Sequence, residues 1–145
     1  MGLVTVRSAV STDIEHIVRI DSCARADETR RTLIESGIAR AECLVAFDDE
    51  LPVGYGVMSH LFFNRGFVSL IYVDAAHRRQ RVATRLFDEF ERRCRSNRIF
   101  TSTNLSNLTM QGLLASRGYG LSGMVQDLDE GDPEMFYSKK LAIRS

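Results

Sequence analysis

The strongest constraint on the fold is an apolar run followed by a helix with one apolar stripe. Residues 67–73 are apolar except for one serine, which is typical of a strand covered on both faces. Val82, Leu86, Phe90 and Cys94 then recur every four residues, which predicts an amphipathic helix. A buried strand leading into such a helix places the chain among folds that pack helices on a sheet.

The remaining pattern predicts a mixed sheet with helices on both faces, an α/β or α+β fold. We expect helices from Thr12 to Asp21, from Glu28 to Ile38 and from Ser106 or Asn107 to Gly118, where glycine takes a left-handed C-terminal position. Further strands are expected over 3–7, 43–47, 53–61, 99–103, 119–128 and 135–141, and the hairpins among them make the sheet mostly antiparallel.

The first predicted helix has a capping box and one mostly apolar face. Thr12 is expected to cap its start, with Glu15 as the partner in a capping box. Asp21 falls on the same helical face as Ile14, Ile17 and Val18.

Length and composition indicate one soluble domain over residues 1–145. No apolar run approaches the ~18–20 residues that span a bilayer, and the first residues lack the apolar core of a signal peptide. Cys23, Cys43 and Cys94 are far apart and have no ligand-like spacing. We therefore expect a cytoplasmic protein with reduced thiols and no metal site.

Charge is balanced overall but unevenly distributed. The 19 basic and 19 acidic residues cancel, which argues against a nucleic-acid or membrane partner on whole-chain charge. Residues 78–98 nevertheless hold eight arginines against three acids, whereas residues 127–134 hold five acids and no base. One region thus favours an anion and the other a cation.

The loop after the apolar run has the chemistry of an anion site. The first amides of a helix lack intrahelical acceptors and lie at the positive end of its dipole, which suits a phosphate or diphosphate. Arg78, Arg79, Arg81 and Arg85 cluster there. The alternative is that these arginines only solvate a helix face, but cations at this end oppose the dipole unless an anion compensates.

These residues resemble the GNAT N-acetyltransferase superfamily. Its signature is a strand ending in a Leu-x-Val-like step and an Arg/Gln-x-x-Gly-x-Gly/Ala loop that opens a helix. Ile71-Tyr72-Val73 resembles the first part, and Arg78-Arg79-Gln80-Arg81-Val82-Ala83 the second. Asn107 and Gly118-Tyr119 match a later helix that starts near Asn and ends at a Gly-aromatic step. The resemblance covers nearly the whole chain.

The resemblance implies acetyl-CoA as cosubstrate. Backbone groups of Ile71 and Val73, flanking Tyr72, would then pair with the pantetheine arm, and an amide there would polarise the thioester carbonyl. Amides from Arg79 through Thr84 would hold the diphosphate, and Arg78, Arg79 or Arg85 would meet the 3′-phosphate. Asn107 would bind pantetheine, although it is equally suited to cap its helix.

Three positions depart from the family pattern. Arg81 stands where the family has Gly, and a residue with the negative φ of a helix is expected to tolerate the exchange. Leu114 replaces the Tyr that serves many relatives as general acid, and Ser69 replaces a Glu base. By chemistry alone, Tyr119 and Tyr137 are candidate acids, and His60 and His77 are candidate bases. The alternatives are that both tyrosines pack on strands, that His77 belongs to the cofactor loop and that His60 belongs to the hairpin. No catalytic residue is therefore assigned.

The acceptor is expected to be a primary amine on a small molecule or a protein. Asp27, Glu28, Asp129 and Glu130 are candidates for drawing in a cationic amine, or are ordinary solvated loop acids. Dimers are common in the family, so a homodimer stays open. Two other functions remain alternatives: a non-catalytic coenzyme A-binding domain, and a nucleic-acid module using the arginines of residues 78–98.

Overall fold

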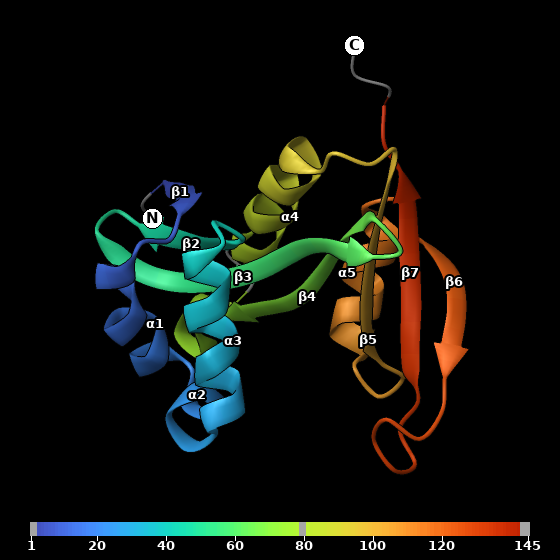
Figure 1. The fold of residues 1–145 in the computed structure, drawn as a ribbon, viewed down its shortest axis with the longest axis horizontal. Coiled ribbons are helices and arrows are strands. Elements are labelled where there is room, and N and C mark those ends of the chain that lie inside the picture. The colour runs from blue at the N-terminus through green and yellow to red at the C-terminus, as the bar shows by residue number, and fades with distance from the viewer. Residues whose placement is uncertain (1–2, 79–80, 143–145) are drawn as a thin grey trace. The chain divides into compact units, whose positions relative to one another are not determined.

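The computed structural model describes residues 3–78 and 81–142 (Figure 1). Strands are β1 (Val4–Ser8), β2 (Cys43–Asp48), β3 (Leu51–Phe62), β4 (Arg65–Val73), β5 (Arg98–Asn104), β6 (Gly120–Val125) and β7 (Glu134–Lys140). Helices are α1 (Ile14–Ile20), α2 (Ser22–Ala26), α3 (Glu28–Ala39), α4 (Val82–Arg93) and α5 (Leu108–Ser116), with 3-10 turns η1 (Ser11–Asp13) and η2 (Ala75–His77). Within these described ranges, no helix has the length and apolarity needed to cross a membrane.

The strands hydrogen-bond in the order β1-β2-β3-β4-β5-β7-β6. β4 and β5 run parallel through Gly66–Val68 and Ile99–Thr101, whereas β1–β2, β2–β3, β5–β7 and β6–β7 are antiparallel. The sequence-based prediction of a mixed, mostly antiparallel α/β sheet is therefore confirmed. The short helix α2 was not predicted, because it forms a separate turn beyond Asp21.

The chain forms two compact units. Unit 1 comprises Met1–Met58 and Leu70–Arg93, and unit 2 comprises Ser59–Ser69 and Cys94–Ser145. β3 and β4 each contribute residues to both units. The expectation that residues 1–145 form one domain stays a prediction.

In unit 1, helices pack on both faces of the strands. Tyr55 and Val57 of β3 join a buried cluster with Ile17 of α1 and Ile34 of α3. Gly54 and Gly56 alternate with them, so they face the opposite side. A Cβ on Gly56 would lie 2.8 Å from the Phe90 ring and 2.8 Å from the Leu70 carbonyl oxygen. The glycines thus let α4 pack close to the sheet.

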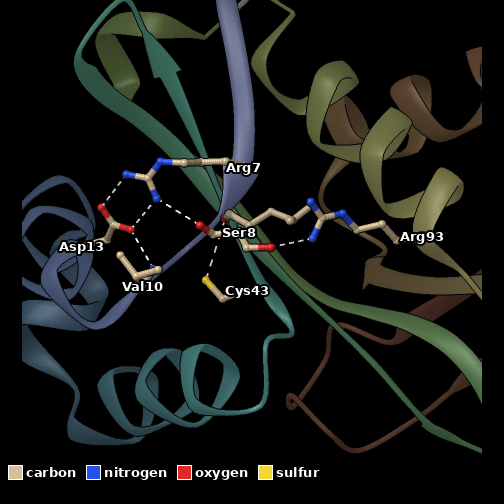
Figure 2. A network of polar contacts seen from close by, with 7 residues as sticks. Arg7, Ser8, Val10, Asp13, Cys43 and Arg93 are labelled. Atoms are coloured by element: carbon tan, nitrogen blue, oxygen red, sulfur yellow. Dashed lines mark hydrogen bonds and ion pairs between the residues drawn. The ribbon is translucent and has the colours of Figure 1, made fainter.

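A polar network joins β1 to η1 and to α4 (Figure 2). Arg7 donates to both oxygens of Asp13 at 2.7 and 3.0 Å, and Asp13 Oδ2 also accepts from the Val10 amide at 2.8 Å. Arg93 of α4 donates to Ser8 Oγ at 2.7 Å. The predicted Thr12–Glu15 capping box is wrong, because Asp13 bonds back to Val10 from a 3-10 turn instead.

In unit 2, a row of phenylalanines lies on one sheet face. Phe62 stacks on Phe67 and Phe136 at ring-centroid distances of 4.8 and 5.9 Å, and Phe100 lies 5.2 Å away. All four rings are only half-buried. The expectation that residues 67–73 are covered on both faces is therefore wrong, because within this stretch Val68 alone is buried. Phe67 stacks on this partly open face, whereas Leu70 and Tyr72 pack against the core cluster of unit 1.

Candidate functional site

The candidate anion site lies in unit 1, where β4 passes through a short loop into α4. The Asp74 amide donates to the Val53 carbonyl at 2.8 Å, which fastens the chain just beyond the last residue of β4. η2 follows, and Arg78 leaves it in an extended conformation. Arg79 and Gln80, both predicted to bind the diphosphate, lie outside the described residues.

His77, in this loop, lies between Asp74 of the same loop and Asp48 at the end of β2. Its Nδ1 lies 3.0 Å from Asp74 Oδ2, and its Nε2 lies 3.9 Å from Asp48 Oδ2. The His77 amide also donates to the Asp74 carbonyl at 2.8 Å. These contacts support the assignment of His77 to the loop in a positioning role. Sequence reasoning missed Asp48, because it comes from the end of β2 and carries no local signal.

Arg81 adopts a left-handed conformation with φ +65°. The prediction of a negative φ is therefore wrong. The chain must turn from the extended backbone of Arg78 into α4, and the first helical hydrogen bond already runs from the Arg85 amide to the Arg81 carbonyl at 3.0 Å. The family's glycine fits this position by its backbone freedom as well as its small size.

The start of α4 combines helical amides with cationic side chains. Val82 is buried, which seats the first turn against the sheet, and Ala83 and Thr84 follow at half-buried positions. Arg81 and Arg85 are exposed at the same end of the helix. Amides at a helix N-terminus attract anions, and the arginines add formal charge.

Arg78 reaches back to the end of β4. Its Nε donates to the Val73 carbonyl at 3.2 Å, and its guanidinium carbon lies 6.0 Å from the centre of the Tyr72 ring. The Val73 carbonyl, predicted to pair with pantetheine, is thus bound to Arg78 in this structure. The Ile71 side chain points to the face opposite Tyr72, since its Cδ1 would lie 2.9 Å from a Cβ on Gly56.

Several other arginines of residues 78–98 bind side chains of the same chain. Glu89 accepts from Arg92 and from Arg93, the latter at 2.8 Å. The hydrogen bond from Arg92, the largest influence, helps lower the pKa of Glu89 to about 2. Arg98 donates to Ser138 Oγ at 3.0 Å. These contacts weaken the alternative of a nucleic-acid surface along residues 78–98.

A sequence comparison decides the family. The profile of the acetyltransferase (GNAT) family matches residues 13–119, which include the whole β4–loop–α4 segment. The chain belongs to the GNAT acetyltransferase family. The resemblance noted in the sequence is thereby confirmed.

Solved GNAT structures share the fold over nearly the whole chain. A GNAT acetyltransferase from Bacillus cereus ATCC 10987 is 33% identical, with a TM-score of 0.91 over 98% of this chain and 100% of its own. Ard1 from Thermoplasma volcanium is 19% identical, with a TM-score of 0.83 over 97% and 99%. The yncA protein of Salmonella typhimurium, solved with its cofactor acetyl-CoA, is 17% identical, with a TM-score of 0.75 over 98% of this chain and 96% of its own. No curated protein matches the chain.

Asn107 caps α5, the alternative that the sequence left open. Its Oδ1 accepts from the Met110 amide at 3.1 Å. This bond fixes the side chain at the start of the helix and leaves the Nδ2 group for the predicted contact with pantetheine. Asn107 belongs to unit 2.

The four predicted acceptor-binding acids have different surroundings. In unit 1, Asp27 caps α3 by accepting from the Thr29 amide at 2.9 Å, and Glu28 is exposed in the first turn. In unit 2, Asp129 accepts from Asn104 Nδ2 at 2.9 Å, and Glu130 is exposed. Asp27 and Asp129 therefore also have structural roles.

A buried network beside Tyr72 was not predicted. Asp21 is fully buried and accepts from the Tyr55 hydroxyl, from Arg30 at 2.8 Å and from the Cys23 amide at 2.9 Å. Burial is the main cause of a raised pKa at Tyr55, and the hydrogen bond to Asp21 adds to it. The Tyr55 and Tyr72 ring centres are 6.0 Å apart. The available signal was Asp21 itself, a carboxylate on an apolar helix face.

The positions that depart from the family's acid–base pattern have structural surroundings. Leu114 is fully buried, and Tyr119 is buried beneath Lys139, whose Nζ lies 5.6 Å from the ring centre. Ser69 is exposed on β4. His60 Nε2 accepts from the Arg95 amide at 3.0 Å. Among the described residues, no group of three or more His, Cys, Asp or Glu side chains is arranged to hold a metal.

Proposed function

We propose that this GNAT protein transfers an acetyl group from acetyl-CoA to a primary amine by direct attack on the thioester. The observation that carries the proposal is the start of α4, where helical amides follow the left-handed turn at Arg81 beside exposed Arg85. Diphosphate is the part of acetyl-CoA that suits such a helix start.

The diphosphate, the 3′-phosphate and the pantetheine arm of coenzyme A each have partners in the proposed site. The amides of Arg81 through Thr84 bind the diphosphate with those of Arg79 and Gln80, and the Thr84 hydroxyl assists. Arg78, Arg79 or Arg85 meets the 3′-phosphate. Backbone groups of Ile71 and Val73 bind the pantetheine arm, so Arg78 must release the Val73 carbonyl when the arm binds. Asn107 offers its Nδ2 group while its Oδ1 keeps the helix cap.

In the proposed reaction, the amine nitrogen bonds to the thioester carbonyl carbon and the carbon–sulfur bond breaks. The cationic amine first gives one proton to water, and its neutral nitrogen loses a second proton on acylation, while the departing thiolate takes one up. A backbone amide near Val73 stabilises the charge that develops on the carbonyl oxygen. Orientation alone lowers the activation barrier by ~7–11 kcal/mol in favourable cases. The reaction therefore does not depend on an acid or base at Leu114 or Ser69, and water can relay the protons.

The proposed acceptor is a cationic amine on a small molecule or a protein. Glu28 and Glu130 are exposed acids in the two predicted acceptor regions. Asp27 and Asp129 add charge there while keeping their structural hydrogen bonds. Charge reversal at Asp129 and Glu130 should raise the KM for the acceptor. The three cysteines are free thiols, which fits the proposed cytoplasmic location.

Calorimetry and thiol release test this function. The protein should bind coenzyme A and release thiol from acetyl-CoA with at least one amine of a panel. Arg85→Glu should weaken coenzyme A binding about tenfold, whereas Arg40→Glu, an exposed arginine at the end of α3, should leave it unchanged.

Other outcomes point to the alternatives. Binding without turnover favours a coenzyme A-binding regulatory domain, in keeping with Leu114 and Ser69. Salt-dependent binding to nucleic acid without coenzyme A binding overturns the proposal. Direct attack predicts intersecting double-reciprocal plots and full activity in Cys23→Ser, whereas parallel plots indicate an acyl-enzyme.

A further inference from the structure

Arg30, in the first turn of α3 in unit 1, is a half-buried arginine that the fold holds by one nitrogen. Its Nη1 donates to Asp21 Oδ2 at 2.8 Å and to the Tyr55 hydroxyl at 3.5 Å. The side chain remains 27% exposed. Its Nε and Nη2 groups make no hydrogen bond to any residue that the structure describes. The guanidinium is thus fixed in place with further donors unused.

The buried carboxylate of Asp21 leaves these donors free because it has other partners. It also accepts from the Tyr55 hydroxyl and from the amides of Cys23 and Ala24, at 2.9 and 3.3 Å. One nitrogen of Arg30 supplies the opposite charge that a buried carboxylate needs. The Nε–H and one N–H of Nη2 form the other edge of the guanidinium, and such an edge binds both oxygens of a carboxylate side by side.

The neighbouring Arg31 shows the contrasting arrangement. Its Nη2 donates to Glu15 at 2.7 Å, and its Nε lies 3.9 Å from Glu35 Oε2. The same edge of Arg31 therefore already faces carboxylates of this chain. Arg30 has no such partner at this edge within the described ranges. This difference indicates that the edge of Arg30 fits a carboxylate from outside the chain.

Arg30 lies close to the proposed reaction site. Its partner Tyr55 has its ring centre 6.0 Å from that of Tyr72, which lies on β4 between the two residues proposed to bind the pantetheine arm. Asp27 and Glu28, proposed to draw in the ammonium group of the acceptor, begin the same helix turn as Arg30. All these residues belong to unit 1. An acceptor bound here meets acids and a preorganised guanidinium together.

We propose that Arg30 binds a carboxylate of the acceptor, so that the substrate is an amine that also carries a carboxylate, such as a free amino acid. This inference rests on the proposed function and narrows its acceptor class. Nε and Nη2 of Arg30 donate to the two carboxylate oxygens, while Nη1 keeps its bond to Asp21. Polyamines and the lysine side chains of proteins have no carboxylate beside the amine, so they are poor acceptors.

Thiol release from acetyl-CoA with matched pairs of amines tests this inference. Each pair is an amino acid and its carboxamide, for example L-phenylalanine and L-phenylalaninamide, drawn from a panel of amino acids. The wild type should have a kcat/KM at least about 10-fold higher for the preferred amino acid than for its carboxamide, which is the effect of one charged hydrogen-bonded contact. Calorimetry on protein saturated with coenzyme A should show the same preference without turnover.

Substitution of Arg30 tests its role in this preference. Arg30→Gln should raise the KM for the amino acid and bring the ratio of kcat/KM within the pair to about one, whereas Arg31→Gln, the matched control, should keep the wild-type ratio. If circular dichroism shows that Arg30→Gln is unfolded, Arg30→Lys replaces it. Lysine keeps the charge opposite Asp21 but has no planar fork, so the ratio should fall in this variant too.

The outcomes separate this inference from the proposed function. Equal kcat/KM for both members of every pair, or a preference for the amino acid that persists in a folded Arg30 variant, overturns the inference and leaves acetyl transfer intact. Failure to bind coenzyme A, or failure to acetylate any amine of the panel, overturns the proposed function and this inference with it.

Discussion

Arg81 shows how one backbone angle links the fold to the proposed chemistry. Its φ of +65° is unfavourable for any residue with a Cβ, costing roughly 1–2 kcal/mol. The residue nevertheless starts α4, since its carbonyl accepts the first helical hydrogen bond from Arg85. Strain of this kind persists where the surrounding structure requires the turn, as it commonly does at binding sites.

Arg81→Gly should therefore stabilise the protein. Removal of the left-handed strain outweighs the larger unfolded-state entropy of glycine, which costs about 0.4–1 kcal/mol, so the free energy of unfolding should rise by about 0.5–1 kcal/mol. Urea denaturation measures the change. Arg85→Gly, inside the helix, should instead lower the free energy by about 1 kcal/mol. Destabilisation by both substitutions would contradict the strain at Arg81.

At the scale of elements, β3 controls how closely its neighbours pack. Gly54 and Gly56 face α4 and β4, and a Cβ on Gly54 would lie 2.8 Å from Val82 Cγ1 and 2.9 Å from the Tyr72 carbonyl oxygen. Tyr55, between them, points to the other side and bonds to Asp21. One strand thus seats the start of α4 on one face and supports Tyr72 from the other.

Gly56→Ala should separate these elements. The added methyl group meets the Leu70 backbone and the Phe90 ring, and overpacking of this kind costs about 1–3 kcal/mol in the free energy of unfolding. Gly112→Ala is the control, because nothing lies within 4 Å of a Cβ there and α5 gains about 0.8–1 kcal/mol from alanine. Chemical denaturation of both variants checks the prediction, which a neutral Gly56→Ala would contradict.

At the scale of the molecule, balanced charge hides strong local differences. Net charge is zero, yet basic residues gather along 78–98 and acids along 127–134. Part of the basic excess stabilises the fold through Glu89, Ser8 and Ser138. Exposed Arg81 and Arg85 remain at the start of α4 for the proposed cofactor.

Stability should depend on pH through His60. Burial, followed by the charge of Arg95, lowers the pKa of His60 below its ordinary value of 6.5, and Nε2 accepts from the Arg95 amide. The folded state therefore favours neutral histidine, and this stability is lost as pH falls through 6.5 toward the lowered pKa. Between pH 7.5 and 5, wild type should lose more free energy of unfolding than His60→Gln. Equal losses would contradict the assignment.

The sequence by itself predicted the features that depend on neighbours in the chain. The stripe from Val82 to Cys94, the glycine turn at Gly118 with φ +88° and the helix start near Asn107 follow from spacing and local hydrogen bonding. The motif from Ile71 to Ala83, with Asn107 and Gly118-Tyr119, was enough to recognise the GNAT family. Periodicity and capping act over a few residues, so a linear pattern carries them.

Only the tertiary structure decided features that depend on residues far apart in the sequence. Such contacts determine four features: the left-handed Arg81, the approach of Asp48 to His77, the Asp21–Tyr55–Arg30 network and the half-buried face of β4. A strained backbone angle or a buried carboxylate is stable only when distant groups compensate its cost. Those groups come together only once the chain has folded, so a local signal such as Asp21 on an apolar helix face does not show which distant residues it will meet.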